Sequence, residues 1–143
     1  MKKLLITSGV YSILALIGGV FFREFTKYYN FVNHTSLSVV HTHLFILGTF
    51  LFILLALLFK DIDLKESKSF KWFFITYNVA LPLFIITLLT RGIIQVVGMN
   101  LTNGLNAMIS GLAGVTHIIL TVSLCLLIPS FKTLIKTKTN NIQ

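Results

Sequence analysis

The stretch LSVVHTHLFILGTFLFILLALLF, Leu37–Phe59, predicts a helix that crosses a lipid bilayer. It contains no lysine, arginine, aspartate or glutamate and is followed by Lys60. About 20 apolar residues in an α-helix, each rising about 1.5 Å, cover the roughly 30 Å of hydrocarbon in a membrane. His41 and His43 lie near the start of this run, and imidazole titrates near neutral pH and binds metals. The stretch therefore indicates both the fold class and the place to look for chemistry.

The composition of the whole chain agrees with a membrane protein. Hydrophobic residues make up 55% of the 143 residues and charged residues 11%, and the mean hydropathy is +0.89, whereas soluble domains carry roughly 25% charged residues. The net charge of +8 comes mainly from lysines that flank the apolar runs, so we expect no nucleic-acid partner. The single cysteine, Cys125, excludes an intrachain disulfide and a CxxC motif, and we expect it to be a packing residue.

Three more apolar runs predict an all-α fold, a transmembrane four-helix bundle that forms a single integral membrane domain over residues 1–143. The spans are expected at about 4–22, 37–59, 72–90 and 105–128. The first run has a basic start, as a signal peptide does, but it lacks a small-x-small cleavage site, so we expect it to be retained. The lipid bilayer is thus the expected partner of all four spans. A homodimer is compatible with so short a bundle, although no residue pattern requires one.

Lysine and arginine are distributed unevenly between the two sides of this bundle. Nine of the twelve lie at the N-terminus, at the C-terminus or in the loop between the second and third spans. Cytoplasmic segments carry an excess of these residues. We therefore expect the N- and C-termini to be cytoplasmic, and the first and third loops to face the outside.

With this orientation, polar residues from all four spans fall in the outer half of the bundle. They are Arg23, Glu24, His41, His43, Arg91, Gln95 and His117. Polar groups are costly inside a bilayer, and they normally face the bundle interior or a water-filled cavity. The sequence therefore predicts one polar site near the outer leaflet.

Helical phase separates the two neighbouring histidines. At about 100° per residue, His41 and His43 point about 200° apart, so one helix cannot direct both into the same bundle centre. Gly48 shares a face with His41 and leaves room for a close helix or a flat ligand, which favours His41 as the inward residue. His117 shares its face with Gly114 and other small residues, which can accept a planar group or a tightly packed helix.

Haem b is the cofactor that this pattern favours, because a four-helix bundle can hold haem between histidines on different helices. His41 and His117 are the expected axial ligands, with His43 as the alternate to His41. Arg91 and Arg23 are expected to hold the propionates, since guanidinium matches carboxylate geometry. The function would then be electron transfer, with a redox partner, or haem-linked sensing. Histidines that only bridge helices by hydrogen bonds remain the plain alternative.

Two other functions stay open. Copper or zinc could be bound by His41, His43 and His117, with His34 or Glu24 contributing, if the start of the second span unwinds. A small membrane transporter is the second, since Pro82 and Gly92 can break or kink helices. The three remaining acids lie in the loop between the second and third spans, across the membrane from the histidines, and no serine nucleophile motif occurs, so hydrolysis is disfavoured. Whether the protein is an enzyme is left open.

A resemblance to a known family covers most of the chain, about Tyr11 to Leu127. It rests on the stretches REFTKYYNF, LSVVHTHLFILGTFLFILLALL, FFITYNVALP, RGIIQVVG and ISGLAGVTHIILTVSLCLL. The chain resembles a family of small four-span bacterial membrane proteins of unknown function, which implies a multi-pass protein of the bacterial cytoplasmic (plasma) membrane. More distantly, the His-x-His opening of the second span is similar to histidine-bearing helices of haem-copper oxidase core subunits and of a nitric-oxide-response membrane family. In those families such histidines bind haem or copper.

Overall fold

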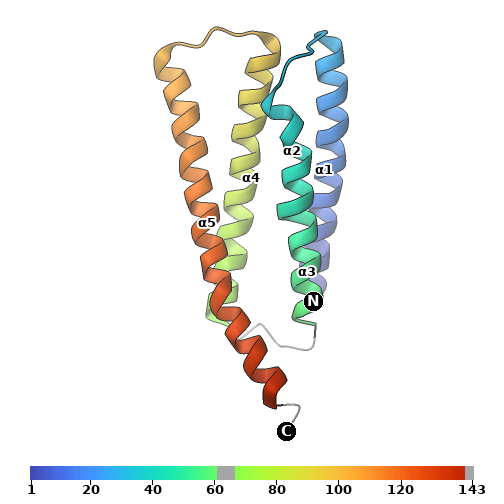
Figure 1. The fold of residues 1–143 in the computed structure, drawn as a ribbon, viewed down its shortest axis with the longest axis vertical. Helices are drawn as coiled ribbons and strands as arrows, with labels where there is room; N and C mark the ends of the chain where they lie inside the picture. Colours follow the sequence, from blue (N-terminus) through green and yellow to red (C-terminus); the bar gives the residue numbers. More distant parts are fainter. Residues whose placement is uncertain (61–66, 141–143) are drawn as a thin grey trace.

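A computed structural model describes the backbone of residues 1–60 and 67–140 and the side chains up to residue 132. Within these residues the chain has no strand, and four of its helical segments are long and apolar enough to cross a membrane. These segments are Lys2–Tyr28, Ser36–Leu58, Lys68–Val97 and Asn103–Lys132. The predicted all-α, four-span class is therefore confirmed, and each expected span falls on one of these helices (Figure 1).

Three of the four spans are continuous helices, and the second is composite. The continuous ones are α1 (Lys2–Tyr28), α4 (Lys68–Val97) and α5 (Asn103–Asn140). The second span begins with the 3-10 turn η1 (Ser36–Val39) and the short helix α2 (Val40–His43), and it continues as the π-helix η2 (Leu44–Phe50) and the helix α3 (Leu51–Leu58). The seven-residue π segment interrupts the regular α-helical phase directly after His43.

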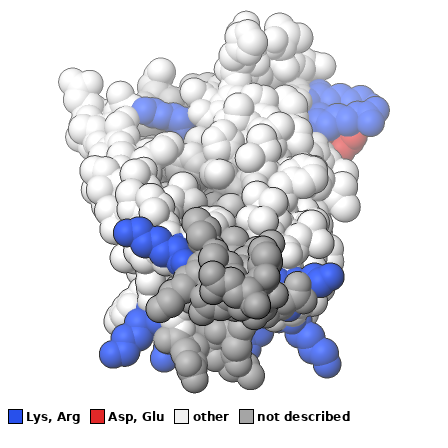
Figure 2. Space-filling view, turned by 60° about the horizontal axis from the view of Figure 1, so that its bottom comes forward, with Lys and Arg blue, Asp and Glu red and all other residues white. Residues whose placement is uncertain are grey.

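The spans pack as a three-helix unit with a fourth helix on its side. The first span packs along the second, the second packs against α4, and α5 packs extensively along α4 (Figure 1). The start of α1 and the end of α5 lie at one end of the bundle, which we call the terminal end, and the connections 29–35 and 98–102 lie at the opposite end, the loop end (Figure 1). Basic side chains gather around the terminal end (Figure 2). The predicted loop residues Asp61, Asp63, Lys65 and Glu66 lie outside the described part of the chain.

Local sequence signals account for the ends of the helices. Ser67 caps α4 by accepting a hydrogen bond from the Phe70 N–H, and α4 ends at Gly98, whose positive φ of 72° suits glycine. Thr35 caps η1 in the same way by accepting from the Leu37 N–H. Pro82 lies inside α4, which continues through it as a helix, as membrane helices often do.

The core is aromatic, and the helices approach closely where glycine allows it. Phe52, Phe73 and Tyr77 are fully buried at the centre of the three-helix unit, and Tyr11 stacks on Phe52 with ring centroids 5.9 Å apart. A Cβ added to Gly48 would lie 2.5 Å from the Tyr11 ring, so only glycine permits this contact. The space that Gly48 was expected to leave for a ligand is therefore occupied by Tyr11.

The outward faces of the helices are apolar. Ile13, Leu57 and Ile118, on three different spans, are each more than half exposed, together with many other large hydrophobic side chains. Such surfaces are stable in contact with lipid tails and not with water. The chain is thus a multi-pass membrane protein whose helices contact the bilayer.

Candidate functional site

The start of the second span is fixed to the loop end of α4 by a set of close contacts. The Thr35 hydroxyl donates to the Gly92 carbonyl at 3.1 Å, and the Ser36 N–H donates to the Gln95 side-chain oxygen at 2.8 Å. A Cβ on Gly92 would lie 2.6 Å from the Leu37 nitrogen, so glycine is needed for this approach. These contacts determine where the two histidines of the second span enter the bundle. Gly92, expected as a helix breaker, is instead a packing position within α4.

His41 and His43 point to different neighbours, as the helical phase predicts. His41 faces the first span: its ring stacks on Phe22 with centroids 6.4 Å apart, and its Cγ lies 3.7 Å from a Cβ placed on Gly19. His43 faces α4, where its ring meets Phe84 edge to face at 5.4 Å. His41 is therefore directed toward α1, and the expected pairing of His41 with a histidine of the fourth span is not what the structure brings together.

His43 and His117 instead share one aromatic contact. The His117 ring meets Phe84 edge to face with centroids 4.2 Å apart. The His43 and His117 rings therefore contact the same phenyl ring, and the distance between their centroids cannot exceed the sum of the two centroid distances to Phe84. Phe84 itself is buried, whereas His117 is exposed on the surface of its helix. We call His43 and His117 the histidine pair.

Both members of the histidine pair are held by their own helix. His43 Nδ1 lies 2.7 Å from the Val39 carbonyl, and His117 Nδ1 lies 2.8 Å from the Ala113 carbonyl. A carbonyl oxygen can only accept, so Nδ1 carries the proton in each ring. In the neutral ring, Nε2 on the far side then has the free lone pair. Metal-binding histidines commonly have this arrangement, in which one nitrogen donates to a backbone carbonyl and the other binds the metal.

An apolar groove of about 520 Å³ begins one turn beyond His43 toward the terminal end, and neither histidine lines it. Leu47, one turn beyond His43, and Leu124, two turns beyond His117, lie on its two walls, together with Ile46, Phe50, Leu51, Ile53, Leu54 and Leu57. Leu124 is the one residue of α5 among those that line it. A Cβ at Gly114 would meet no atom of the described residues within 4 Å, so no helix in the described part of the chain covers the small face beside His117.

The two arginines differ in their surroundings. Arg91, on α4, donates through Nη1 to the Asn106 side chain and through Nη2 to the Ser110 hydroxyl at 2.7 Å, both on α5. It lies seven residues, or about 10 Å along the helix, from Phe84. Arg23, at the end of α1, is 82% exposed and lies 3.8 Å from Glu24. Arg91 is therefore the arginine beside the helix that carries His117.

The other metal-binding candidates are dispersed. Among the described residues, no group of three or more histidine, cysteine, aspartate or glutamate side chains lies close enough to bind a metal ion. His34 is an exposed loop residue, and Cys125 is exposed on the fourth span rather than packed in the core. The three-histidine site considered for copper or zinc is thus not assembled in this part of the chain.

A polar layer in the middle of the bundle was not predicted as part of the site. It consists of Ser8, Tyr11 and Ser12 on α1, Thr49 on η2, and Tyr77 and Asn78 on α4. Tyr77 donates to the Leu47 carbonyl at 2.9 Å, and Ser8 donates to the Thr49 carbonyl at 3.1 Å. Both acceptors belong to the π segment, which two neighbouring helices therefore hold by side-chain hydroxyls. The signal was present in the sequence as polar residues inside apolar runs.

These features define the chain as a four-span integral membrane helix bundle with a polar layer and with two histidines, on the second and fourth spans, that contact the same α4 ring. A family described as "Protein of unknown function (DUF2871)" matches residues 1–134, and the chain belongs to this family. The expected membership of a small membrane protein family of unknown function is thereby confirmed. No curated protein and no solved structure matches the chain. The distant similarity to oxidase helices accordingly has no support from these comparisons.

Proposed function

We propose that this chain binds haem b between its second and fourth spans and acts in electron transfer or haem-linked sensing. The observation that carries the proposal is the histidine pair on Phe84, with Nδ1 of each ring hydrogen-bonded to its own helix. His43 and His117 would hold the haem, and His43 takes the place that the sequence favoured for His41. A haem held by these two side chains would supply the redox or ligand-binding chemistry of its iron.

Two protein histidines are enough for haem but not for a zinc ion. The porphyrin supplies four nitrogen ligands, so the protein needs to provide only the two axial ones. Structural zinc sites need four protein ligands, and catalytic ones need three. The histidine pair, together with the dispersed positions of His34, His41 and Glu24, therefore favours haem over copper or zinc.

The surroundings of the histidine pair also suit a planar apolar group. The groove beside Leu47 and Leu124 is apolar, and the exposed ring of His117 is a polar group on a membrane-spanning helix, which is costly unless something covers it. Arg91 lies about 10 Å along α4 from Phe84 and is the arginine that we expect beside the propionates, rather than Arg23.

The proposal also includes the orientation of the protein in the membrane and its partners. We expect the terminal end in the cytoplasm of a bacterial cell, because basic side chains gather there (Figure 2). The site would then lie in the outer half of the membrane, since Phe84 is two turns from Arg91 and more than three turns from Trp72. Electron transfer requires a redox partner, and a second copy of the chain is a further candidate to cover α5.

The absorption spectrum of the protein tests the proposal. We expect protein purified from haem-supplied cells, or reconstituted with haem, to show a Soret band and the spectrum of six-coordinate low-spin iron. The His43→Ala and His117→Ala variants should each lose this spectrum, and His41→Leu, whose histidine faces α1, should keep it. Absence of a Soret band after haem addition to folded wild-type protein would refute haem binding.

Elemental analysis of the same sample detects copper or zinc, and solute uptake by vesicles tests the transporter alternative.

A further inference from the structure

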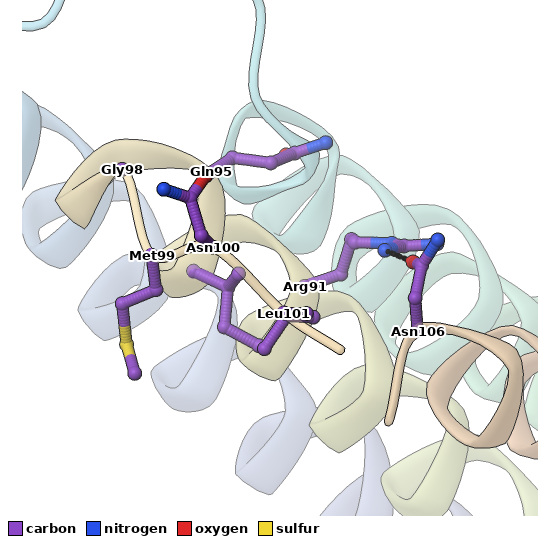
Figure 3. A pocket seen from close by; sticks show the side chains of 8 residues that line it. Arg91, Gln95, Gly98, Met99, Asn100, Leu101 and Asn106 are labelled. Carbon is purple, nitrogen blue, oxygen red and sulfur yellow. Dashed lines mark hydrogen bonds between the residues drawn. The ribbon is translucent and has the colours of Figure 1, made fainter. Parts of the chain in front are cut away.

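A second cavity lies at the loop end of the bundle, about 10 Å along α4 from the ring that joins the histidine pair. It has a volume of about 400 Å³, a size typical of sites for small molecules. Arg91 and Gln95 line it from α4, Asn100 from the connection and Asn106 from α5. Figure 3 shows Arg91 and Asn106 reaching toward one another from these two helices.

The side chains that line this cavity have N–H donors without a hydrogen-bond partner among the described residues. Two of their side-chain oxygens already accept hydrogen bonds. The Gln95 oxygen accepts from the Ser36 N–H, and the Asn106 oxygen accepts from Arg91 Nη1. Because both partners are N–H groups, the acceptors must be the amide oxygens, and the NH₂ groups of Gln95 and Asn106 remain to donate. The Arg91 guanidinium has five N–H donors. Two of them are used, one for the Asn106 oxygen and one for the Ser110 hydroxyl.

The charge of the cavity also favours an anionic ligand. No carboxylate lines it, and Glu24, the one acidic residue among those described, lies beside Arg23 on α1. Arg91 therefore lacks an acidic partner within the described part of the chain and is surrounded by neutral amides and a hydroxyl. A partly buried guanidinium with neutral donors around it binds carboxylate or phosphate groups well, because its N–H groups form charge-assisted and bidentate hydrogen bonds with them.

We propose that this cavity is an anion site, which binds a carboxylate or phosphate group through Arg91 with help from Asn106 and Gln95. The group can belong to a small solute on the outer side or to the headgroup of an anionic lipid, since both present the same chemistry. The proposal does not rest on haem binding, and it is tested with haem-free protein.

The full-length chain is purified without haem and studied with two probes. In phosphatidylcholine nanodiscs, inorganic phosphate and acetate are titrated calorimetrically. In detergent, native mass spectrometry measures how much added phosphatidylglycerol stays bound relative to phosphatidylcholine. Saturable binding of phosphate or acetate supports a solute site, and selective retention of phosphatidylglycerol supports a headgroup site. In either case we expect Arg91→Gln to weaken binding by at least about tenfold, because it removes the charge that strengthens these hydrogen bonds.

Arg23→Gln is the matched control, since Arg23 is an exposed arginine at the same end but on α1. Asn106→Asp is the second variant: it keeps the acceptor for Arg91 and the shape of the side chain, but it places a carboxylate in the cavity, so it should abolish anion binding in a folded protein. His117→Ala should keep anion binding, which separates this proposal from haem binding. If Arg91→Gln and Asn106→Asp bind both probes as Arg23→Gln does, the proposal is overturned.

Discussion

Replacing Tyr77 by phenylalanine should weaken the hold of α4 on the π segment. The Tyr77 side chain is fully buried, and its hydroxyl donates to the Leu47 carbonyl at 2.9 Å. The ring packs on Phe52 and Phe73 with centroids 5.8 and 5.2 Å away, contacts that phenylalanine keeps. The substitution therefore removes one interhelical hydrogen bond and little else.

The expected magnitude follows from the value of such bonds inside membranes. Interhelical hydrogen bonds there contribute about 0.6 kcal/mol on average and up to about 1.7 kcal/mol, so the unfolding equilibrium constant should rise about 3- to 20-fold. Unfolding by sodium dodecyl sulfate in mixed micelles measures this change, with Trp72, the single tryptophan of the chain, as fluorescent probe. Hydrogen exchange of Leu44–Phe50 should also become faster, because the π segment loses one of its anchors.

Tyr28→Phe is the matched control for this experiment. Tyr28 is 80% exposed near the end of α1, so removal of its hydroxyl should change neither the free energy of unfolding nor exchange in the π segment. If Tyr77→Phe and Tyr28→Phe behave alike in both measurements, the inference that side-chain hydroxyls hold the π segment is wrong.

Three further substitutions test the packing of the bundle by the same unfolding assay. Gly48→Ala should destabilise by about 1–3 kcal/mol, because its Cβ would lie 2.5 Å from the Tyr11 ring and must push α1 away. Gly111→Ala is its control, since a Cβ there meets nothing within 4 Å, and it should stabilise α5 by up to about 1 kcal/mol; equal effects at the two sites would contradict the close contact. His41→Leu removes a buried Nδ1 that has no hydrogen-bond partner among the described residues, so the free energy of unfolding should stay unchanged or rise; a clear loss would show that His41 has a polar partner.

The spans and the opposite directions of the two histidines were predictable because both follow from regular helix geometry. Length and apolar composition are enough to define a span, and 100° per residue is enough to separate His41 from His43. Each of these predictions uses information within a single helix.

The other expectations depended on a neighbouring helix, which helical phase does not show. Gly48 was taken to make room on the His41 face, but Tyr11, 37 positions earlier in the sequence, fills that room. The choice between His41 and His43 depends on whether α1 or α4 lies opposite each ring, and helical phase gives only the angle between them. The π segment changes the phase beyond His43, and its stabilising hydroxyls come from α1 and α4. No pattern within Leu37–Phe59 reports these partners.

The unequal packing of the four spans gives a physical reason why a ligand site would form where the histidine pair lies. Hydroxyl bonds of the polar layer link α1, the second span and α4, so His43 belongs to a unit held by directional interactions. His117 belongs to α5, which packs extensively against α4 alone among the described elements and meets the end of the second span through Phe131 and Phe59 near the terminal end. Moving α5 by a small amount at the level of His117 breaks no hydrogen bond of the polar layer. In the proposed function, α5 would adjust to a planar group while His43 stays in place, and the hydrogen bonds of Arg91 to Asn106 and Ser110 would have to move with it.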